Sequence, residues 1–324
     1  MDTLLADIGG THARFALLDS GTHGEVTTLA VADHADCAAA VTGWLGAAAP
    51  GLRLRRALLA VAGPVQDNRA TLVNSPWGEV DGNRLIEQLG CEVRLLNDFE
   101  AVGWSLPVLR QDELAMIGPG APDPTVPMVA LGPGTGFGAA CYLPQAGGLV
   151  LATEAGHTTL PATDLREADV VETLWARFGH VSVERVLSGP GLSNLLDAVA
   201  ELEGLDIEPQ TPADIVAAAS QPGNPMAREA VQLFCRFFGT VAGNLALTFG
   251  ARGGVFLAGG ITPRIADVLA RSQFRACFTA KGRFQPWLEG VPTAVITRPC
   301  PAMAGLAAVA QRGGWGGFVG TGIR

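Results

Sequence analysis

Two short glycine-rich segments have residues that could bind phosphate groups. The first reads Asp-Ile-Gly-Gly-Thr over residues 7–11, and the second reads Gly-Pro-Gly-Thr-Gly-Phe-Gly over residues 132–138. Glycine lets the backbone approach phosphate oxygens closely, and the N–H groups of a tight turn can form an anion-binding nest. Asp7 stands where a carboxylate could hold a water molecule bound to Mg²⁺. A hairpin turn alone explains the first segment, but four glycines in seven residues exceed what a hairpin needs.

Neither segment matches the two common nucleotide-binding motifs. If Gly132 and Gly134 begin a Gly-x-Gly-x-x-Gly pattern, its last position is Phe137. No Gly-Lys-Ser/Thr sequence occurs, and the only lysine, Lys281, is distant in sequence from both segments. A Walker-type kinase is therefore excluded, and phosphate binding would rest on backbone N–H groups, hydroxyls and Mg²⁺.

An acidic residue follows a predicted buried strand. The strand predicted at residues 92–96 ends at Asn97 and Asp98, and ligands of open α/β sheets bind beyond the carboxyl ends of strands. Asp98 could accept a proton from a hydroxyl nucleophile. It could equally be the N-cap of the helix predicted after it.

Three further polar residues suit the recognition of hydroxyl groups: Glu154, His157 and Glu184. The Glu-x-x-His spacing also occurs in di-metal helix bundles, but those sites need a second such pair. Gly156 also disfavours a helix here. Glu184 could alternatively be the carboxylate at a helix start.

A third glycine cluster surrounds a short apolar run. Gly253-Gly254 and Gly259-Gly260 flank the residues VFLA at 255–258. Such glycines could let adenosine lie against the backbone, although a helix cap and a strand end explain them more simply.

Buried strands and helices are predicted to alternate, which indicates an α/β architecture with a largely internal sheet. Residues 124–153 are uncharged but contain too many glycines and prolines for a membrane helix, so we expect two buried strands joined by a turn. The other predicted strands are 3–8, 13–18, 57–62, 92–96 and 255–258, and the predicted helices are 36–48, 83–89, 165–178, 190–203 and 226–250.

Two segments follow the same plan of apolar strand, glycine turn and apolar strand. They are LLADIGGTHARFALLD and MVALGPGTGFGAACYL, and an offset of 125 residues places Gly9 on Gly134. This similarity suggests an internal duplication.

Composition narrows the classes of partner. The chain has 324 residues and a formal charge of −9, with 48% hydrophobic and 16% charged residues, which excludes disorder. The acidic balance argues against nucleic acid and against an anionic membrane surface. Six scattered cysteines without a CxxC pair indicate reduced thiols, and no signal-peptide pattern begins the sequence, so we expect a cytoplasmic protein.

Taken together, these residues resemble the bacterial ATP-dependent glucokinase family, within the hexokinase, actin and heat-shock-ATPase superfamily. The resemblance runs from LLADIGGTHARFAL at residue 4 to CPAMAGLAAV at 300–309, and it is densest at 235–264. LNDFEAVGWSLP, LGPGTGFGAA, EAGHTTLPA and ERVLSGPGL match in family order. Two departures are Phe137, where leucine is expected, and Ala155, where glycine is usual.

The resemblance implies a role for each matched residue. Asp98 would be the general base for the sugar 6-hydroxyl, and the other hydroxyls would be bound by Asn97, Glu154, His157 and Glu184. The phosphate turns would be Gly9, Gly10 and Thr11, with Asp7 on the Mg²⁺ side, and Gly134, Thr135, Gly136 and Gly138. Gly259 and Gly260 would contact adenosine.

The resemblance also implies the fold and the partners. We expect two ribonuclease-H-like (actin-like ATPase) α/β domains flanking a central cleft: a small domain of residues 1–108 plus 302–324, and a large domain of 109–301. The expected substrates are glucose and ATP with Mg²⁺, and the expected assembly is a homodimer. Another hexose, such as mannose, fructose or an amino sugar, is the alternative substrate. A sugar-sensing repressor is disfavoured by the charge and by a phosphate turn that begins at residue 7, which leaves no room for a helix-turn-helix.

Overall fold

The computed structural model describes residues 2–72 and 75–312. The chain forms two compact units: the first comprises Met1–Leu109 and Pro299–Arg324, and the second comprises Arg110–Arg298. The sequence-based division differs from this one at Leu109 and at residues 299–301, which it placed in the larger domain. Each unit is described by itself below.

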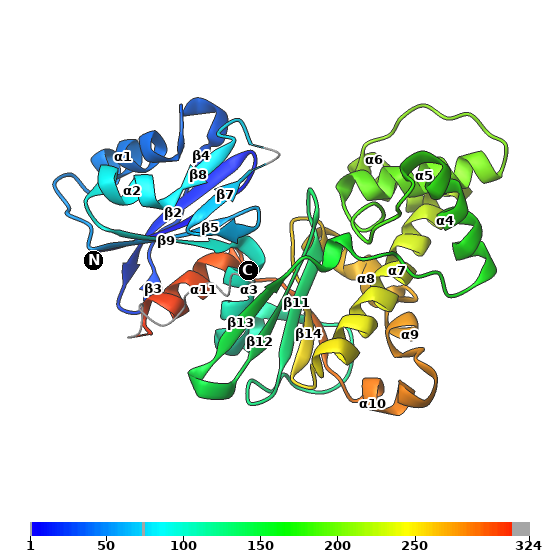
Figure 1. Cartoon of the computed structure of the whole chain (residues 1–324). Coiled ribbons are helices and arrows are strands. Elements are labelled where there is room, and N and C mark those ends of the chain that lie inside the picture. Colours follow the sequence, from blue (N-terminus) through cyan, green and yellow to red (C-terminus); the bar gives the residue numbers. More distant parts are fainter. Residues whose placement is uncertain (1, 73–74, 313–324) are drawn as a thin grey trace. The chain divides into compact units, whose positions relative to one another are not determined.

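The first unit is built on a mixed sheet whose order is β3-β2-β1-β5-β9, with β4 also paired to β2. β1 and β2 form an antiparallel hairpin, while β1, β5 and β9 are parallel. Helices α1 and α2 cover one face, and α3 and α11 cover the other (Figure 1). The strands are β1 (Thr3–Ile8), β2 (His12–Asp19), β3 (Thr22–His23), β4 (Thr27–Ala30), β5 (Arg56–Val61) and β9 (Glu92–Asn97). The helices are α1 (Cys37–Ala48), α2 (Gly82–Leu89), α3 (Asp98–Ser105) and α11 (Pro301–Ala310).

A small antiparallel sheet of β6, β7 and β8 also belongs to the first unit. Its strands are β6 (Val65–Gln66), β7 (Arg69–Thr71) and β8 (Glu79–Asp81).

The second unit contains a six-stranded sheet of order β10-β15-β14-β11-β12-β13. The strands β11, β12 and β13 are antiparallel neighbours, while β11, β14 and β15 are parallel. The strands are β10 (Leu114–Met116), β11 (Met128–Pro133), β12 (Phe137–Leu143), β13 (Leu149–Thr153), β14 (Gly254–Leu257) and β15 (Thr293–Ile296). The helices are α4 (Leu165–Phe178), α5 (Gly189–Leu202), α6 (Pro212–Ala219), α7 (Pro225–Phe249), α8 (Ala266–Arg271), α9 (Phe274–Thr279) and α10 (Gln285–Glu289).

The two large sheets repeat one topology, which confirms the predicted duplication. In each, a hairpin is followed by two parallel strands on the side of its first strand, in the orders β2-β1-β5-β9 and β12-β11-β14-β15. The turns differ by one residue. Four residues separate the paired Ile8 and Ala13, but three separate Pro133 and Phe137. The offset of 125 residues therefore holds up to the turn and shifts by one after it.

The uncharged segment at 124–153 contains three strands rather than the two predicted. The third, β13, pairs with β12 from Ala139↔Thr153 to Leu143↔Leu149. It is separated from β12 by Gly147 and Gly148, both at positive φ, which the sequence-based interpretation counted among the helix breakers. Leu151 and Ala152 of β13 are exposed, whereas every residue of β11 is buried.

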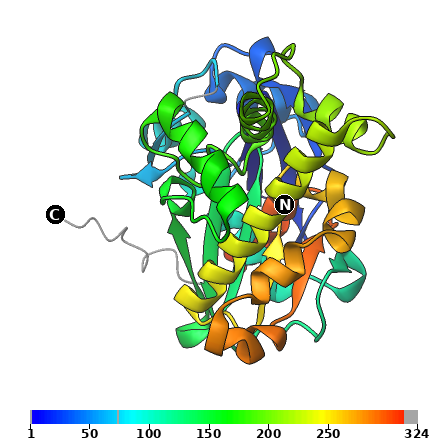
Figure 2. The same ribbon diagram turned by 90° about the vertical axis from the view of Figure 1, so that its right-hand side faces the viewer.

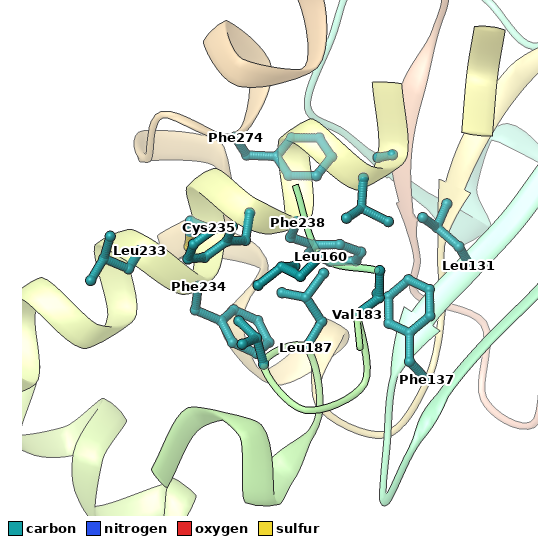
Figure 3. Packing of buried hydrophobic residues seen from close by; sticks show 14 of the residues in the cluster. Leu131, Phe137, Leu160, Val183, Leu187, Leu233, Phe234, Cys235, Phe238 and Phe274 are labelled. Atoms are coloured by element: carbon teal, nitrogen blue, oxygen red, sulfur yellow. The ribbon is translucent and has the colours of Figure 1, made fainter. Parts of the chain in front are cut away.

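Helix α7 lies against β11 and β14 and forms the centre of the larger core (Figures 1 and 2). It is long and apolar enough, by length and composition alone, to span a membrane, but 72% of its most apolar window is buried inside the unit. Phe238 on α7 contacts Phe137, Phe234 and Phe274 edge-to-face at centroid distances of 5.4 to 6.2 Å (Figure 3). Aromatic rings prefer such offset geometries, which favours a single packing of this core.

Lys281 connects the segment that follows α9 to helix α7. Its Nζ donates to the backbone oxygen of Thr240 at 3.1 Å. Burial lowers the pKa of this amine below its ordinary value.

Candidate active site

The first glycine turn leaves two backbone donors available. The N–H of Gly9 donates to the oxygen of His12 at 2.9 Å, and the oxygen of Thr11 accepts from Val31 at 2.9 Å. In the described part of the chain, the N–H groups of Gly10 and Thr11 make no hydrogen bond. Adjacent free N–H groups in a tight turn are the arrangement that binds an anion.

Asp7 is the acidic residue beside this turn, and it is paired with Arg14. Its Oδ2 lies 3.1 Å from Nη1 of Arg14 across the β1–β2 hairpin. Burial raises the pKa of the Asp7 carboxyl, and Arg14 opposes this by lowering it. Sequence reasoning missed Arg14, although hairpin pairing about the turn places residues 7 and 14 opposite each other.

The first glycine turn has one feature that suits a Mg²⁺ ion bound to a nucleotide, which is the nearby carboxylate of Asp7. Such an ion keeps most of its ligands as water and phosphate oxygens and needs only one or two carboxylates. Asp7 is the one carboxylate beside the turn that could contact such an ion through water, and it is already paired with Arg14. Among residues 2–72 and 75–312, no group of three or more His, Cys, Asp or Glu side chains could hold a metal by itself.

The second turn repeats this pattern in three residues. The N–H of Gly134 donates to the oxygen of Gly136 at 2.7 Å, and the oxygen of Gly134 accepts from Gly189 at 2.9 Å. Within the described residues, the N–H groups of Thr135 and Gly136 are without partners. Both turns thus present two consecutive free donors.

Several glycines in these clusters are required by the protein's own packing. A Cβ atom on Gly132 would lie 2.0 Å from the oxygen of Ala258, and one on Gly259 would lie 2.3 Å from the oxygen of Pro133. These two glycines therefore let the ends of β11 and β14 lie close together. Gly134 and Gly260 face open space instead, so close approach to a ligand explains only part of the glycine richness.

Asn97 and Asp98 lie at the carboxyl edge of the first sheet. Ile8 pairs with Val61 and Val61 with Asn97, so the first turn and Asp98 leave the sheet at the same edge. Asn97 is the N-cap of α3, because its Oδ1 accepts from Phe99 at 2.9 Å and from Glu100 at 3.1 Å. The suggestion that Asp98 is the N-cap is therefore wrong.

Asp98 is the first residue of α3. Its Oδ1 accepts the N–H of Phe99 at 2.8 Å, and its side chain is half-buried. The positive end of the helix dipole favours a carboxylate at this position.

Glu154 precedes a short 3₁₀ turn of the second unit, and His157 is the last residue of that turn; the segment is not an α-helix, as Gly156 predicted. Their side chains are 62% and 65% exposed and approach to 3.9 Å. Glu184 follows on the adjacent segment, where its N–H donates to the oxygen of Gly156 at 2.8 Å. It does not begin a helix, because α5 is capped by Ser188.

Gly138 and Ala155 take ordinary positions in this unit. Gly138 lies in β12 opposite Gly132, and Ala155 is buried beside the larger core. Ala155 has no positive φ, so alanine is accommodated where glycine was expected. Phe137 is 7% exposed and fills the core with its ring.

Two sheets of one topology, each with a glycine turn after its first strand, define a protein of the actin-like ATPase fold. A family model described as Glucokinase matches residues 4–313. The chain belongs to the glucokinase family, and both the predicted fold class and the resemblance are confirmed.

Individual relatives agree over nearly the whole chain. The glucokinase of Paramagnetospirillum magneticum is 45% identical over 94% of this chain and 96% of its own length. That of Nitrobacter hamburgensis is 41% identical over 94% and 95%. A solved glucokinase from an Antarctic psychrotroph has a TM-score of 0.85 at 33% identity, covering 95% of this chain and 98% of that one.

A more distant structure shares the fold. A ROK family glucokinase from Streptomyces griseus, solved in complex with glucose and AMPPNP, has a TM-score of 0.65 at 20% identity. The match covers 95% of this chain and 98% of that one.

Proposed function

We propose that this chain transfers the γ-phosphoryl group of ATP to the 6-hydroxyl of glucose, giving glucose 6-phosphate and ADP. The observation that carries the proposal is membership of the glucokinase family over residues 4–313. Asp98 and the first phosphate turn both follow strands that end at the same edge of the first sheet. This supports the proposal, because phosphoryl transfer needs the base and the phosphate-binding N–H groups close together.

In this proposal Asp98 accepts the proton of the sugar 6-hydroxyl as the oxygen attacks the γ-phosphorus. The bond to the β-phosphate oxygen breaks, and ADP leaves. The free N–H groups of Gly10, Thr11, Thr135 and Gly136 hold phosphate oxygens and stabilise the charge that develops on them. Asp7 would hold a water of the Mg²⁺ that accompanies the nucleotide, and that ion would supply further neutralisation of phosphate charge.

In the proposal the sugar hydroxyls are bound by side chains that accept hydrogen bonds and by side chains that also donate them. Carboxylates accept hydrogen bonds only, whereas an amide both donates and accepts. Asn97, Glu154, His157 and Glu184 together therefore suit a polyol, and a polyol that lacks one hydroxyl would leave a site group unpaired. Gly259 and Gly260 would lie beside adenosine. We further propose that the enzyme acts as a cytoplasmic homodimer.

Replacement of Asp98 by Asn tests the base. Asn keeps the size of the side chain and can still accept the N–H of Phe99, but it cannot take the proton. We expect kcat to fall by about 10²–10⁴-fold, with glucose affinity largely retained. A coupled assay of glucose 6-phosphate formation measures this.

Asp36→Asn is the matched control. It makes the same change at the N-cap of α1, where Asn also caps well, so turnover should be unchanged. Near-normal turnover in Asp98→Asn would remove Asp98 as the base.

The hexose itself is tested by a panel. The side chains of Glu154 and His157 are exposed, and their positions alone do not determine which hexose stereochemistry they would bind. We expect the highest kcat/KM for glucose among glucose, mannose, fructose and amino sugars. A higher value for another hexose would replace glucose as the substrate.

A further inference from the structure

Glu184 joins the sugar-side segment to the second phosphate turn. Its backbone N–H donates to the oxygen of Gly156 at 2.8 Å, and its carboxylate Oε2 accepts the N–H of Phe137 at 2.8 Å. Phe137 is the residue that directly follows the turn at 134–136 and begins β12. One side chain therefore contacts both parts of the proposed site.

The peptide of Phe137 is held from both sides. A Cβ atom on Gly156 would lie 2.4 Å from the oxygen of Phe137, so these backbones are in direct contact. The ring of Phe137 is anchored in the core against Phe238 (Figure 3). The residue that Glu184 contacts is therefore packed against the backbone of Gly156 and against the core.

Gly136 provides the space for this carboxylate. A Cβ atom there would lie 2.4 Å from Oε2 and 3.1 Å from Cδ of Glu184. Gly136 has no positive φ, and a side chain there would displace the Glu184 carboxylate from the position in which it accepts the N–H of Phe137. Gly134, two residues earlier in the same turn, has nothing within 4 Å of its virtual Cβ.

The second carboxylate oxygen of Glu184 is available to a ligand. A carboxylate has two oxygens with about four acceptor positions. Oε2 is used by Phe137, while Oε1 accepts no hydrogen bond from the described residues. A sugar hydroxyl can therefore donate to Oε1 while Oε2 still holds the turn.

We propose that Gly136 and Glu184 form a positioning device that couples hexose binding to the geometry of the second phosphate turn. The inference rests on the proposed function, because it takes Glu184 as a sugar ligand. A hexose that fixes Glu184 also fixes the N–H groups of Thr135 and Gly136 for the nucleotide. Linkage requires the reverse effect to be equal, so the nucleotide also raises hexose affinity.

The first arm of the test asks whether the phosphate turn affects the sugar. Gly136→Ala should push Oε2 away from Phe137 and raise the Kd of glucose, measured by calorimetry without nucleotide, by about tenfold or more. Gly134→Ala changes the same turn in open space, so it should leave that Kd within about twofold. Equal effects of the two variants, or none from Gly136→Ala, would overturn the coupling.

The second arm asks whether the sugar residue affects the nucleotide, and it introduces no clash. Glu184→Ala removes the acceptor for Phe137 and should weaken binding of AMPPNP without sugar by about tenfold. Glu154→Ala removes a sugar-side carboxylate that makes no hydrogen bond or ion pair with the turn within residues 2–72 and 75–312, so it should weaken glucose binding but leave AMPPNP binding unchanged. Unchanged AMPPNP affinity in Glu184→Ala would overturn the inference even if Gly136→Ala failed to fold.

The unsubstituted protein separates this inference from the proposed function. If it does not bind glucose, the proposed function fails and the coupling fails with it. If it binds glucose and Gly136→Ala binds equally well, the coupling alone is overturned.

Discussion

At the residue scale, a side chain's partner decides its chemistry more than its type does. Asp7 was predicted as a carboxylate near Mg²⁺, but the hairpin places Arg14 against it at 3.1 Å. The glycine cluster at 132–138 was attributed as a whole to close approach of a ligand, but at Gly132 the oxygen of Ala258 occupies the space that a side chain would need. Local patterns identified these residues, whereas their partners come from register and from a strand more than 100 residues away, which no short motif encodes.

Glu100 gives a pH-dependent prediction. Burial raises the pKa of its carboxyl above the ordinary value, with Arg94 opposing the shift, so the folded protein binds this proton more tightly than the unfolded chain. The stability from the protonated form is fully present below the unfolded pKa and is lost as the pH rises through the folded one. Glu100→Gln stays neutral, so its Tm should exceed that of the unsubstituted protein at pH 7–8, and the difference should shrink toward pH 4.

Thermal unfolding at several pH values measures this difference. Asp112→Asn is the control, because Asp112 is exposed and its pKa is lowered by Arg110, so no gain at neutral pH is expected. A lower Tm for Glu100→Gln at pH 8 would mean that the 3.9 Å pair with Arg94 outweighs burial.

At the element scale, the sequence predicted those elements that carry their own pattern. The strands at 3–8 and 57–62 were predictable because each is mostly apolar, and the strand at 92–96 because its valine and two leucines lie between turn residues. Most of the strands and helices that were missed have eight residues or fewer, which is too short for hydrophobic periodicity to identify them. They include β3, β4, β10, β15, α6, α8, α9 and α10.

The packing of α11 on α3 gives a prediction about the element that carries Asp98. A Cβ atom on Gly305 of α11 would lie 1.7 Å from the oxygen of Ala101 on α3. Gly305→Ala should therefore push α3 outward, destabilise the protein by about 1–3 kcal/mol or more, and lower kcat. Urea unfolding and the coupled assay measure both effects.

Gly46, which lies in helix α1, provides the control for Gly305→Ala. Gly46 in α1 is exposed with nothing near its virtual Cβ, so Gly46→Ala should stabilise by about 0.5–1 kcal/mol. Equal stability of the two alanine variants would show that α11 and α3 have room for a side chain.

At the scale of the whole molecule, the repeated topology divides the chain into two units with separate cores. The two ends of the second unit are joined to each other. β10 pairs with β15, Thr297 donates to the oxygen of Glu113 at 2.8 Å, and Arg298 pairs with the Glu113 carboxylate. The unit is thus closed where the chain enters and leaves it.

We therefore expect residues 110–298 to fold without the rest of the chain. The isolated fragment should show one cooperative thermal transition by circular dichroism, because its sheet and core are complete within it. Glu113→Gln should lower the Tm of the fragment, since it weakens the pair with Arg298. A fragment without a cooperative transition would mean that the first unit is needed to fold the second.

Lys281, whose amine donates to Thr240 within the α7–α9 packing, has a consequence for the covalent chemistry of the whole protein. It is the only lysine among 324 residues, so acetylation, glycation and amine-reactive dyes find a single side-chain target. That target is half-buried and engaged in a hydrogen bond. The positive charge of the surface is carried by guanidinium groups, and trypsin would cleave this chain almost entirely after arginine.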